Sequence, residues 1–304
     1  MRVTQSMLYR QTLATLNERQ GNIMRGQDQI ASGTRLNQAK DDPVAMSRVM
    51  RNDDMLTTLK RHDANIASLS SRLSFVEAEL GSVSDLMHRA RELMISGANA
   101  TQSAESRSTL ALEMRALGED LLRIANGQDG QGRYLFAGQD DATTPFVEAV
   151  GVNYQGATSA RQIEVDQSAT MANGLTGDAV FLNGPAGDLF AMFDELADTL
   201  EMPTPDAAST AQRNADMDAG LARVDDALNH VLDLRTGLGV DLQRLDTAAE
   251  RISALQISVQ TDSSGLRDTD VAQTLSQLAQ ELTALEAAQK TFTRIQSLSL
   301  FNYL

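Results

Sequence analysis

The sequence has no cysteine and no tryptophan among its 304 residues, and its aromatic content is only 4%. The missing cysteines exclude disulfide bonds, thiolate nucleophiles, iron–sulfur clusters and cysteine-ligated zinc. No stretch of 18 consecutive apolar residues occurs, so we expect no contact with a membrane through a spanning helix. Residues 1–6 are not followed by an apolar core, and we therefore expect no Sec-type signal peptide.

Positive charge is also scarce, since 26 Lys and Arg stand against 41 Asp and Glu and the net charge is −15. Nucleic-acid binding requires clustered basic residues, so we expect no nucleic-acid partner. The imbalance is uneven: residues 1–61 carry +4 and the rest carries −19. A mildly basic arm on an acidic body could steer contacts between subunits, and a solvated face is an equally good interpretation.

Proline is confined to positions 43, 145, 185, 203 and 205, which leaves two long proline-free stretches, 44–144 and 206–304. Half of the 20 glycines lie between Gly127 and Gly187. Long helices exclude proline from their interiors, whereas hairpins need glycine. The order predicted is therefore helix, compact β-rich insert, helix.

Apolar residues repeat with 4,3 spacing from Met55 to Met94, and His62 is the exception among twelve positions. The same spacing recurs over 110–124 and over 221–259. Three stripes with one period can bury one another by lying side by side in a bundle. Asp41 and Asp42 before Pro43 predict the start of the first long helix, as N-caps; a catalytic carboxylate pair is the alternative.

The middle of the chain contains short runs typical of strands, at 133–137, 146–150, 161–165 and 178–182. They predict an antiparallel β region. An amphipathic helix is expected over 187–200, followed by a stiff hinge at 202–206 with two prolines.

Both ends carry apolar stripes with no evident cover inside the chain, and this pattern indicates surfaces that need a partner. Gly21 and Gly26 interrupt the N-terminal stripe and should leave it poorly ordered alone. The candidate assembly residues are Leu13, Leu16, Ile23, Ile30, Leu278, Leu282, Leu285, Phe292, Ile295, Leu298 and Phe301.

No pattern of residues supports catalysis or a cofactor. The three histidines, His62, His88 and His230, are far apart in sequence, and residues 127–132 lack the spacing of a dinucleotide-binding loop. No phosphate loop, G-x-S-x-G or H-E-x-x-H occurs. We expect no enzyme activity, cofactor, metal site or small-molecule substrate.

The segment Ala31–Ala45, which reads ASGTRLNQAKDDPVA, resembles the sequence after the first helix of bacterial flagellins and their relatives. The final LSLFNYL, residues 298–304, is similar to the end of the hook-associated protein 3 family. The segments 132–138, 161–165 and 244–248 are similar to that family too, whereas Ala39-Lys40 is closer to flagellin. These matches follow one another in order along the whole chain.

The resemblance implies an adaptor between the hook and the filament of the bacterial flagellum, at the hook–filament junction. It implies a ring of copies, hook-associated protein 1 and flagellin as partners, and export by the flagellar type III pathway with a dedicated chaperone. It also implies terminal helices that form coiled coils on assembly. Two alternatives stay open: a flagellin filament subunit, and an adhesive or ligand-binding protein on a coiled-coil stalk.

The expected fold is mainly α: a long antiparallel coiled-coil or helical-bundle rod of the flagellin type, with a small β-rich inserted domain and helical arms at both ends. The expected division is an N-terminal arm and linker (1–42), rod helices (43–126), the β-rich insert with one short helix (127–202), a long rod helix (203–262) and a C-terminal arm (263–304).

Overall fold

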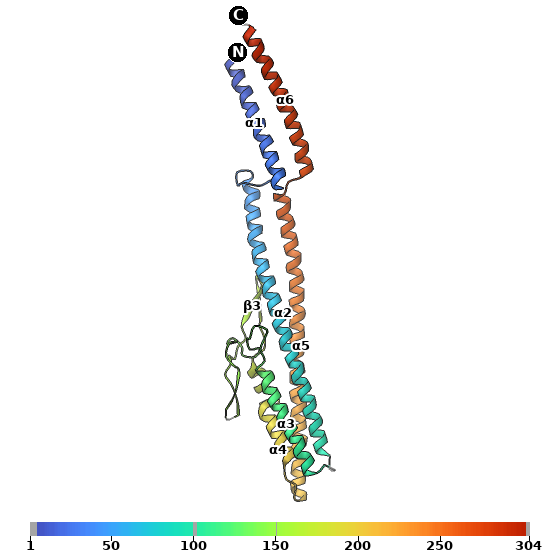
Figure 1. Ribbon diagram of the computed structural model, residues 1–304. Coiled ribbons are helices and arrows are strands. Elements are labelled where there is room, and N and C mark those ends of the chain that lie inside the picture. Colours follow the sequence, from blue (N-terminus) through green and yellow to red (C-terminus); the bar gives the residue numbers. More distant parts are fainter. Residues whose placement is uncertain (1–4, 100–101, 150, 302–304) are drawn as a thin grey trace. The chain divides into compact units, whose positions relative to one another are not determined.

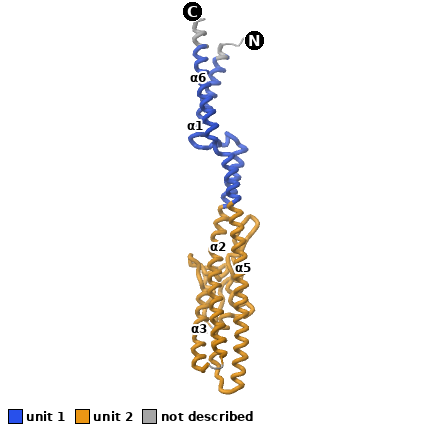
Figure 2. The backbone as a smooth tube through the Cα atoms, turned by 90° about the vertical axis from the view of Figure 1, so that its right-hand side faces the viewer, with its two compact units in different colours: residues 1–59, 254–304 blue, residues 60–253 orange. Residues whose placement is uncertain are grey.

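The computed structural model describes the backbone of residues 5–99, 102–149 and 151–301, and their side chains except those of residues 5, 6, 8 and 295–301. Within these residues the chain is mainly helical, with two small antiparallel sheets (Figure 1). The predicted fold class is thereby confirmed. The chain divides into two compact units (Figure 2): unit 1 comprises residues 1–59 and 254–304, and unit 2 comprises residues 60–253.

Two long helices, α2 (Pro43–Ala98) and α5 (Ala207–Arg267), contribute residues to both units. The carboxylate of Asp42 accepts a hydrogen bond from the backbone N–H of Ala45 at 3.0 Å, so Asp42 is an N-cap as predicted. In unit 2 the helices run antiparallel, with ion pairs between Arg91 and Asp225 and between Arg235 and Glu77. The predicted stripe of α2 is buried from Leu59 to Met94, His62 included, and Met55 is exposed.

Two shorter helices, α3 (Ala104–Ala125) and α4 (Leu189–Glu201), complete the helical bundle of unit 2. Ser103 and Asp188 are their N-caps. The buried face of α4 presents large apolar side chains to its neighbours, as its predicted amphipathic pattern requires. Gly118 lets α3 approach α4 closely, because a Cβ added there would lie 3.2 Å from the Cβ of Phe193.

The β region consists of two hairpins of two strands each. Strands β1 (Phe146–Ala149) and β2 (Gly151–Tyr154) form the first. Strands β3 (Gln162–Asp166) and β4 (Ala169–Ala172) form the second, with a register shift between Glu164 and Asp166.

Two of the expected strands are wrong. Residues 133–137 make isolated bridges at Tyr134 and Ala137, and residues 178–182 form a short π-helical turn, η1 (Asp178–Leu182). Phe136 and Phe181 are both buried, and their rings meet edge to face with centroids 5.2 Å apart. Strand propensity largely reflects burial of aromatic and branched side chains, which these segments achieve without a sheet.

The terminal helices of unit 1 are α1 (Gln5–Ser32) and α6 (Val271–Phe301). The helix α1 runs without a break through Gly21 and Gly26, and α5 runs in the same way through Gly237 and Gly239. Among the described residues, no helix is both long enough and apolar enough to cross a bilayer.

Candidate assembly interface

The two terminal helices pack against each other in antiparallel fashion, so each partly covers the apolar stripe of the other (Figure 1). Near the chain ends the rings of Tyr9 and Phe292 lie 5.5 Å apart. Further along, the guanidinium of Arg19 donates to the carboxylate of Glu281 at 2.7 Å. The expectation that both stripes lack any cover within the chain is therefore corrected, because α1 and α6 form a pair.

The segments that connect these helices to the long helices are held together by backbone hydrogen bonds. The N–H of Arg35 donates to the carbonyl of Arg267 at 2.7 Å, and the N–H of Thr269 donates to the carbonyl of Gly33 at 3.0 Å. Leu36 is buried in a small cluster with residues of α2. The carboxylate of Asp41 accepts from the N–H of Gln38 at 2.9 Å and stabilises this turn. Asp41 and Asp42 thus have structural roles, and the catalytic-pair alternative has no support in their geometry.

The predicted assembly residues differ in exposure. Ile23 is buried, and Leu16, Ile30, Leu278, Leu285 and Phe292 are half-buried. Leu13 and Leu282 are exposed. The side chains of Ile295, Leu298 and Phe301 lie outside the described residues.

Beside the α1–α6 pair runs a polar groove of about 1060 Å³. Its walls come from α1, α6 and the connecting segments, and they include Arg19, Arg25, Arg35, Asp268 and Glu281. Both signs of charge and several amides are available there. The groove therefore supplies hydrogen-bonding groups next to the exposed apolar side chains of the same pair.

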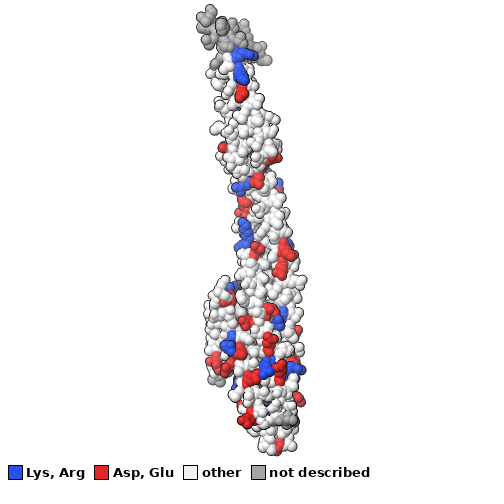
Figure 3. Space-filling model, turned by 45° about the vertical axis from the view of Figure 1, so that its right-hand side comes forward, with Lys and Arg blue, Asp and Glu red and all other residues white. Residues whose placement is uncertain are grey.

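Exposed apolar side chains are concentrated in unit 1. Of the 17 large hydrophobic side chains that are exposed among the described residues, 12 belong to unit 1, which holds the smaller part of the chain. Unit 1 is also electrically neutral, with 11 Lys and Arg and 11 Asp and Glu, whereas unit 2 has 15 and 30. In the view of Figure 3 the α1–α6 surface shows few charged side chains, and the unit 2 surface shows many of both signs. Neutral, apolar surfaces favour association, and charged ones favour solvation.

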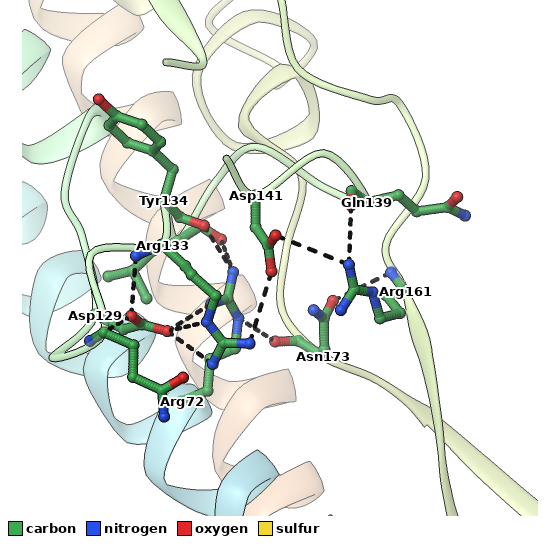
Figure 4. Close-up of polar contacts among 10 residues, drawn as sticks. Arg72, Asp129, Arg133, Tyr134, Gln139, Asp141, Arg161 and Asn173 are labelled. Atoms are coloured by element: carbon green, nitrogen blue, oxygen red, sulfur yellow. Dashed lines mark hydrogen bonds and ion pairs between the residues drawn. The ribbon is translucent and has the colours of Figure 1, made fainter. Parts of the chain in front are cut away.

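Unit 2 contains a buried polar junction between α2 and the β region (Figure 4). The guanidinium of Arg72 donates to the carboxylate of Asp129 at 3.0 Å, to the carbonyl of Asn173 at 3.0 Å and to the carbonyl of Tyr134 at 2.7 Å. The side chains of Arg72 and Asp129 are each 6% exposed. Arg133 also donates to Asp129, at 3.1 Å. One arginine of α2 thus holds two segments that flank the hairpins: the loop 129–134 before β1, and Asn173 directly after β4.

The charges of this junction affect one another. Burial alone would raise the pKa of Asp129, but hydrogen bonds from the N–H groups of Arg133 and Gln131, with the nearby guanidinium groups, hold that pKa below its ordinary value. Burial lowers the pKa of Arg72, and Asp129 offsets part of that effect. Both groups are ionised at neutral pH, so the junction is an ion pair.

The segment 132–138 lies next to this junction, and burial and backbone geometry explain its apolar residues and its last glycine. Leu135, Phe136 and Ala137 are buried. Gly138 has a φ of +69°, and a Cβ there would lie 2.3 Å from the carbonyl oxygen of Ala157. Arg72 and Asp129 could not be predicted as partners from the sequence, because Arg72 lies beside the apolar stripe of α2 and a single arginine there forms no recognisable pattern.

The histidines do not form a common site. His62 is buried with neither ring nitrogen hydrogen-bonded, His88 is exposed, and His230 contacts the carbonyl of Ala179 at 3.0 Å. Across the described residues, no group of three or more His, Asp or Glu side chains is placed to hold a metal ion.

Both ends of the chain match family models of bacterial flagellin. The model of the bacterial flagellin N-terminal helical region matches residues 3–141, and that of the C-terminal helical region matches residues 221–304. A flagellin of Bacillus subtilis is 25% identical over 95% of this chain and 94% of its own. These matches and the helical fold define a structural component of the bacterial flagellum and not an enzyme.

Two relatives that match almost the whole chain are hook-associated proteins and not flagellins. Flagellar hook-associated protein 3 of Escherichia coli is 32% identical, over 99% of both chains, and that of Salmonella typhimurium is 28% identical, over 99% of both. A putative flagellar hook-associated protein from Vibrio parahaemolyticus has a TM-score of 0.68 at 25% identity, covering 75% of this chain and all of its own. The chain belongs to the flagellar hook-associated protein 3 family.

Proposed function

We propose that this protein is the adaptor that joins the flagellar hook, through hook-associated protein 1, to the flagellin filament. The observation that carries the proposal is the character of unit 1: it is neutral, it contains both terminal helices, and it holds most of the exposed large apolar side chains. An adaptor must bind neighbours on two sides, and such surfaces are suited to that role.

In this proposal the subunits form a ring in which the terminal helices of neighbouring copies pack together. The interface uses the stripes of α1 and α6, with Leu13, Leu282 and the flanking residues Leu16, Ile23, Ile30, Leu278, Leu285, Phe292, Ile295, Leu298 and Phe301. The arms 1–42 and 263–304 are the assembling parts, the rod segments 43–126 and 203–262 build the wall, and the insert 127–202 faces outward. A chaperone and the flagellar type III pathway export the chain.

Isolated hooks that carry hook-associated protein 1, prepared from cells lacking this chain, provide the test. Purified full-length protein should add a short ring at the hook tip in electron micrographs, and subsequent addition of flagellin should then start filaments. Failure to bind the hook tip, or filament growth that is equally efficient without the chain, would contradict the adaptor role.

A flagellin role is the second candidate, supported by the likeness to Bacillus subtilis flagellin over 95% of the chain. A filament subunit should polymerise alone into long filaments under salting-out conditions. The adaptor proposal predicts short rings or soluble protein in the same experiment.

If the insert had an adhesive role, the property lost on its deletion would be surface attachment and not the filament. Deletion of residues 127–202 would then remove surface attachment and leave the filament in place.

A further inference from the structure

Two arginines are buried at one end of the unit 2 bundle without a carboxylate partner. Arg107, in the first turn of α3, is 6% exposed, and Arg213, in the second turn of α5, is 5% exposed. Figure 1 shows that the C-terminal ends of α2 and α4 and the N-terminal ends of α3 and α5 lie together there. Arginine stays protonated in proteins, so this end of the bundle contains two buried positive charges.

The contacts of the two guanidinium groups do not compensate these charges fully. Arg107 donates to the carbonyl of Leu200 at 3.3 Å and to the carbonyl of Gln102 at 3.1 Å. The first of these carbonyls belongs to the last turn of α4, where a cation is favoured. Arg213 donates to the side-chain oxygen of Asn214 at 3.0 Å, and its Nε is buried without a partner. A buried cation near the N-terminus of α5 lies at the positive end of that helix.

The two groups also act on each other. Burial lowers the pKa of Arg107, and the positive charge of Arg213 lowers it further. The contrast with Arg72 is direct, because that buried arginine is paired with Asp129. Every Asp and Glu of the chain lies among the residues whose side chains are described, and none comes within 4 Å of Arg107 or Arg213 in an ion pair. Unit 2 has twice as many acidic as basic residues, yet none of its acidic side chains forms an ion pair with Arg107 or Arg213.

We infer that Arg107 and Arg213 form a binding site for an oxyanion at this end of unit 2. The ligand class is a phosphate, a sulfate or a carboxylate, which arginine recognises with paired N–H donors. Two sources offer this chemistry: a free inorganic anion, and a carboxylate side chain of a neighbouring flagellar subunit. The second source rests on the proposed assembly, and the first does not.

The test on the free anion uses the purified full-length chain and inorganic phosphate exchanged for chloride at constant ionic strength. The thermal midpoint of the wild type should rise by about 3 °C and level off at high phosphate. The variant Arg213→Met should lose this saturable rise and should melt no lower than the wild type in chloride, because an unpaired buried charge is removed. Arg213→Lys keeps the charge without the paired donors and should show a smaller rise.

Arg123→Met is the matched control, because Arg123 is exposed and pairs with Asp120 on its own helix. It should respond to phosphate as the wild type does. If phosphate gives no saturable rise in the thermal midpoint, the ligand is the carboxylate of a neighbouring subunit. In that case Arg213→Met should weaken ring formation at least tenfold in sedimentation, and Arg123→Met should leave it unchanged. Equal responses of all variants to phosphate, together with equal ring formation, would overturn the site. Because the phosphate experiment needs no assembly, its result is independent of the adaptor proposal.

Discussion

At the scale of single residues, Arg72 links the helices of unit 2 to the β region. Its guanidinium contacts Asp129 and Tyr134 of one loop and Asn173, which lies about 40 residues further along the chain. Removing one partner of a buried ion pair leaves the other charge uncompensated, which costs more than the pair contributes in isolation. The attachment of the β region therefore depends strongly on one side chain.

Replacing Arg72 with Leu should lower the free energy of unfolding by about 3 kcal/mol, because Asp129 and two carbonyl groups lose their donor. Urea denaturation followed by circular dichroism measures this change. The control is Arg115→Leu, at a partly exposed arginine that pairs with Asp198 and Glu201 and should cost less than about 1 kcal/mol. Equal losses for the two variants would show that Arg72 has no special role.

The lowered pKa of Asp129 predicts a dependence on acid. Its contribution to stability is complete above its ordinary pKa of 3.8 and is lost as the pH falls through its lower folded-state pKa. Asp129→Asn should therefore be less stable than the wild type at pH 7, and the gap should narrow below about pH 4. Urea midpoints measured from pH 7 to pH 3 provide the comparison. A gap that stays constant over this range would exclude the ionised carboxylate as its cause.

At the scale of elements, the sequence predicted the helices better than the strands. The 4,3 stripes anticipate the buried positions of α2 because a long helix repeats its environment every few residues. His62 is buried like the apolar residues of the stripe although it is polar, so its burial is determined by its position on the helix and not by its residue type. Phe136 and Phe181 misled the strand prediction because burial of aromatic rings does not require a sheet.

Glycine within long helices provides an element-scale prediction. Gly237 lies in the interior of α5, and a Cβ added there would have no atom within 4 Å, so Gly237→Ala should stabilise the chain by about 0.5–1 kcal/mol. Gly118→Ala offers the same gain in helix propensity but brings a Cβ to 3.2 Å from that of Phe193. It should therefore gain less or lose stability. Thermal unfolding of both variants measures the difference, and an equal gain would contradict the close α3–α4 contact.

At the scale of the whole molecule, the charge is divided between the two units in a way that total composition conceals. The net charge of −15 belongs to unit 2, and unit 1 is neutral. The terminal stripes could be predicted from spacing alone. Their mutual packing could not, because an apolar stripe does not specify which helix covers it. The junction at Arg72 depends on contacts distant in sequence and left no local pattern.

Substitution of an exposed apolar residue of α6 should separate folding from assembly. Leu282→Glu should leave helicity and thermal midpoint nearly unchanged, since Leu282 is exposed, and should reduce the number of filaments on cells severalfold. Leu112→Glu is the control, because Leu112 is an exposed leucine of unit 2. Filament counts by electron microscopy should fall for the first variant only. Equal effects would argue against assembly through α6.

If this chain is the adaptor, its C-terminal helix α6 is needed for assembly and not for the fold of unit 2. Removal of residues 274–304 in the source bacterium separates these two roles, with cells scored for filaments and the medium assayed for flagellin. We expect a soluble, largely helical protein, loss of filaments and flagellin released into the medium. Normal filaments on cells that carry only the truncated chain would show that α6 is not needed for assembly.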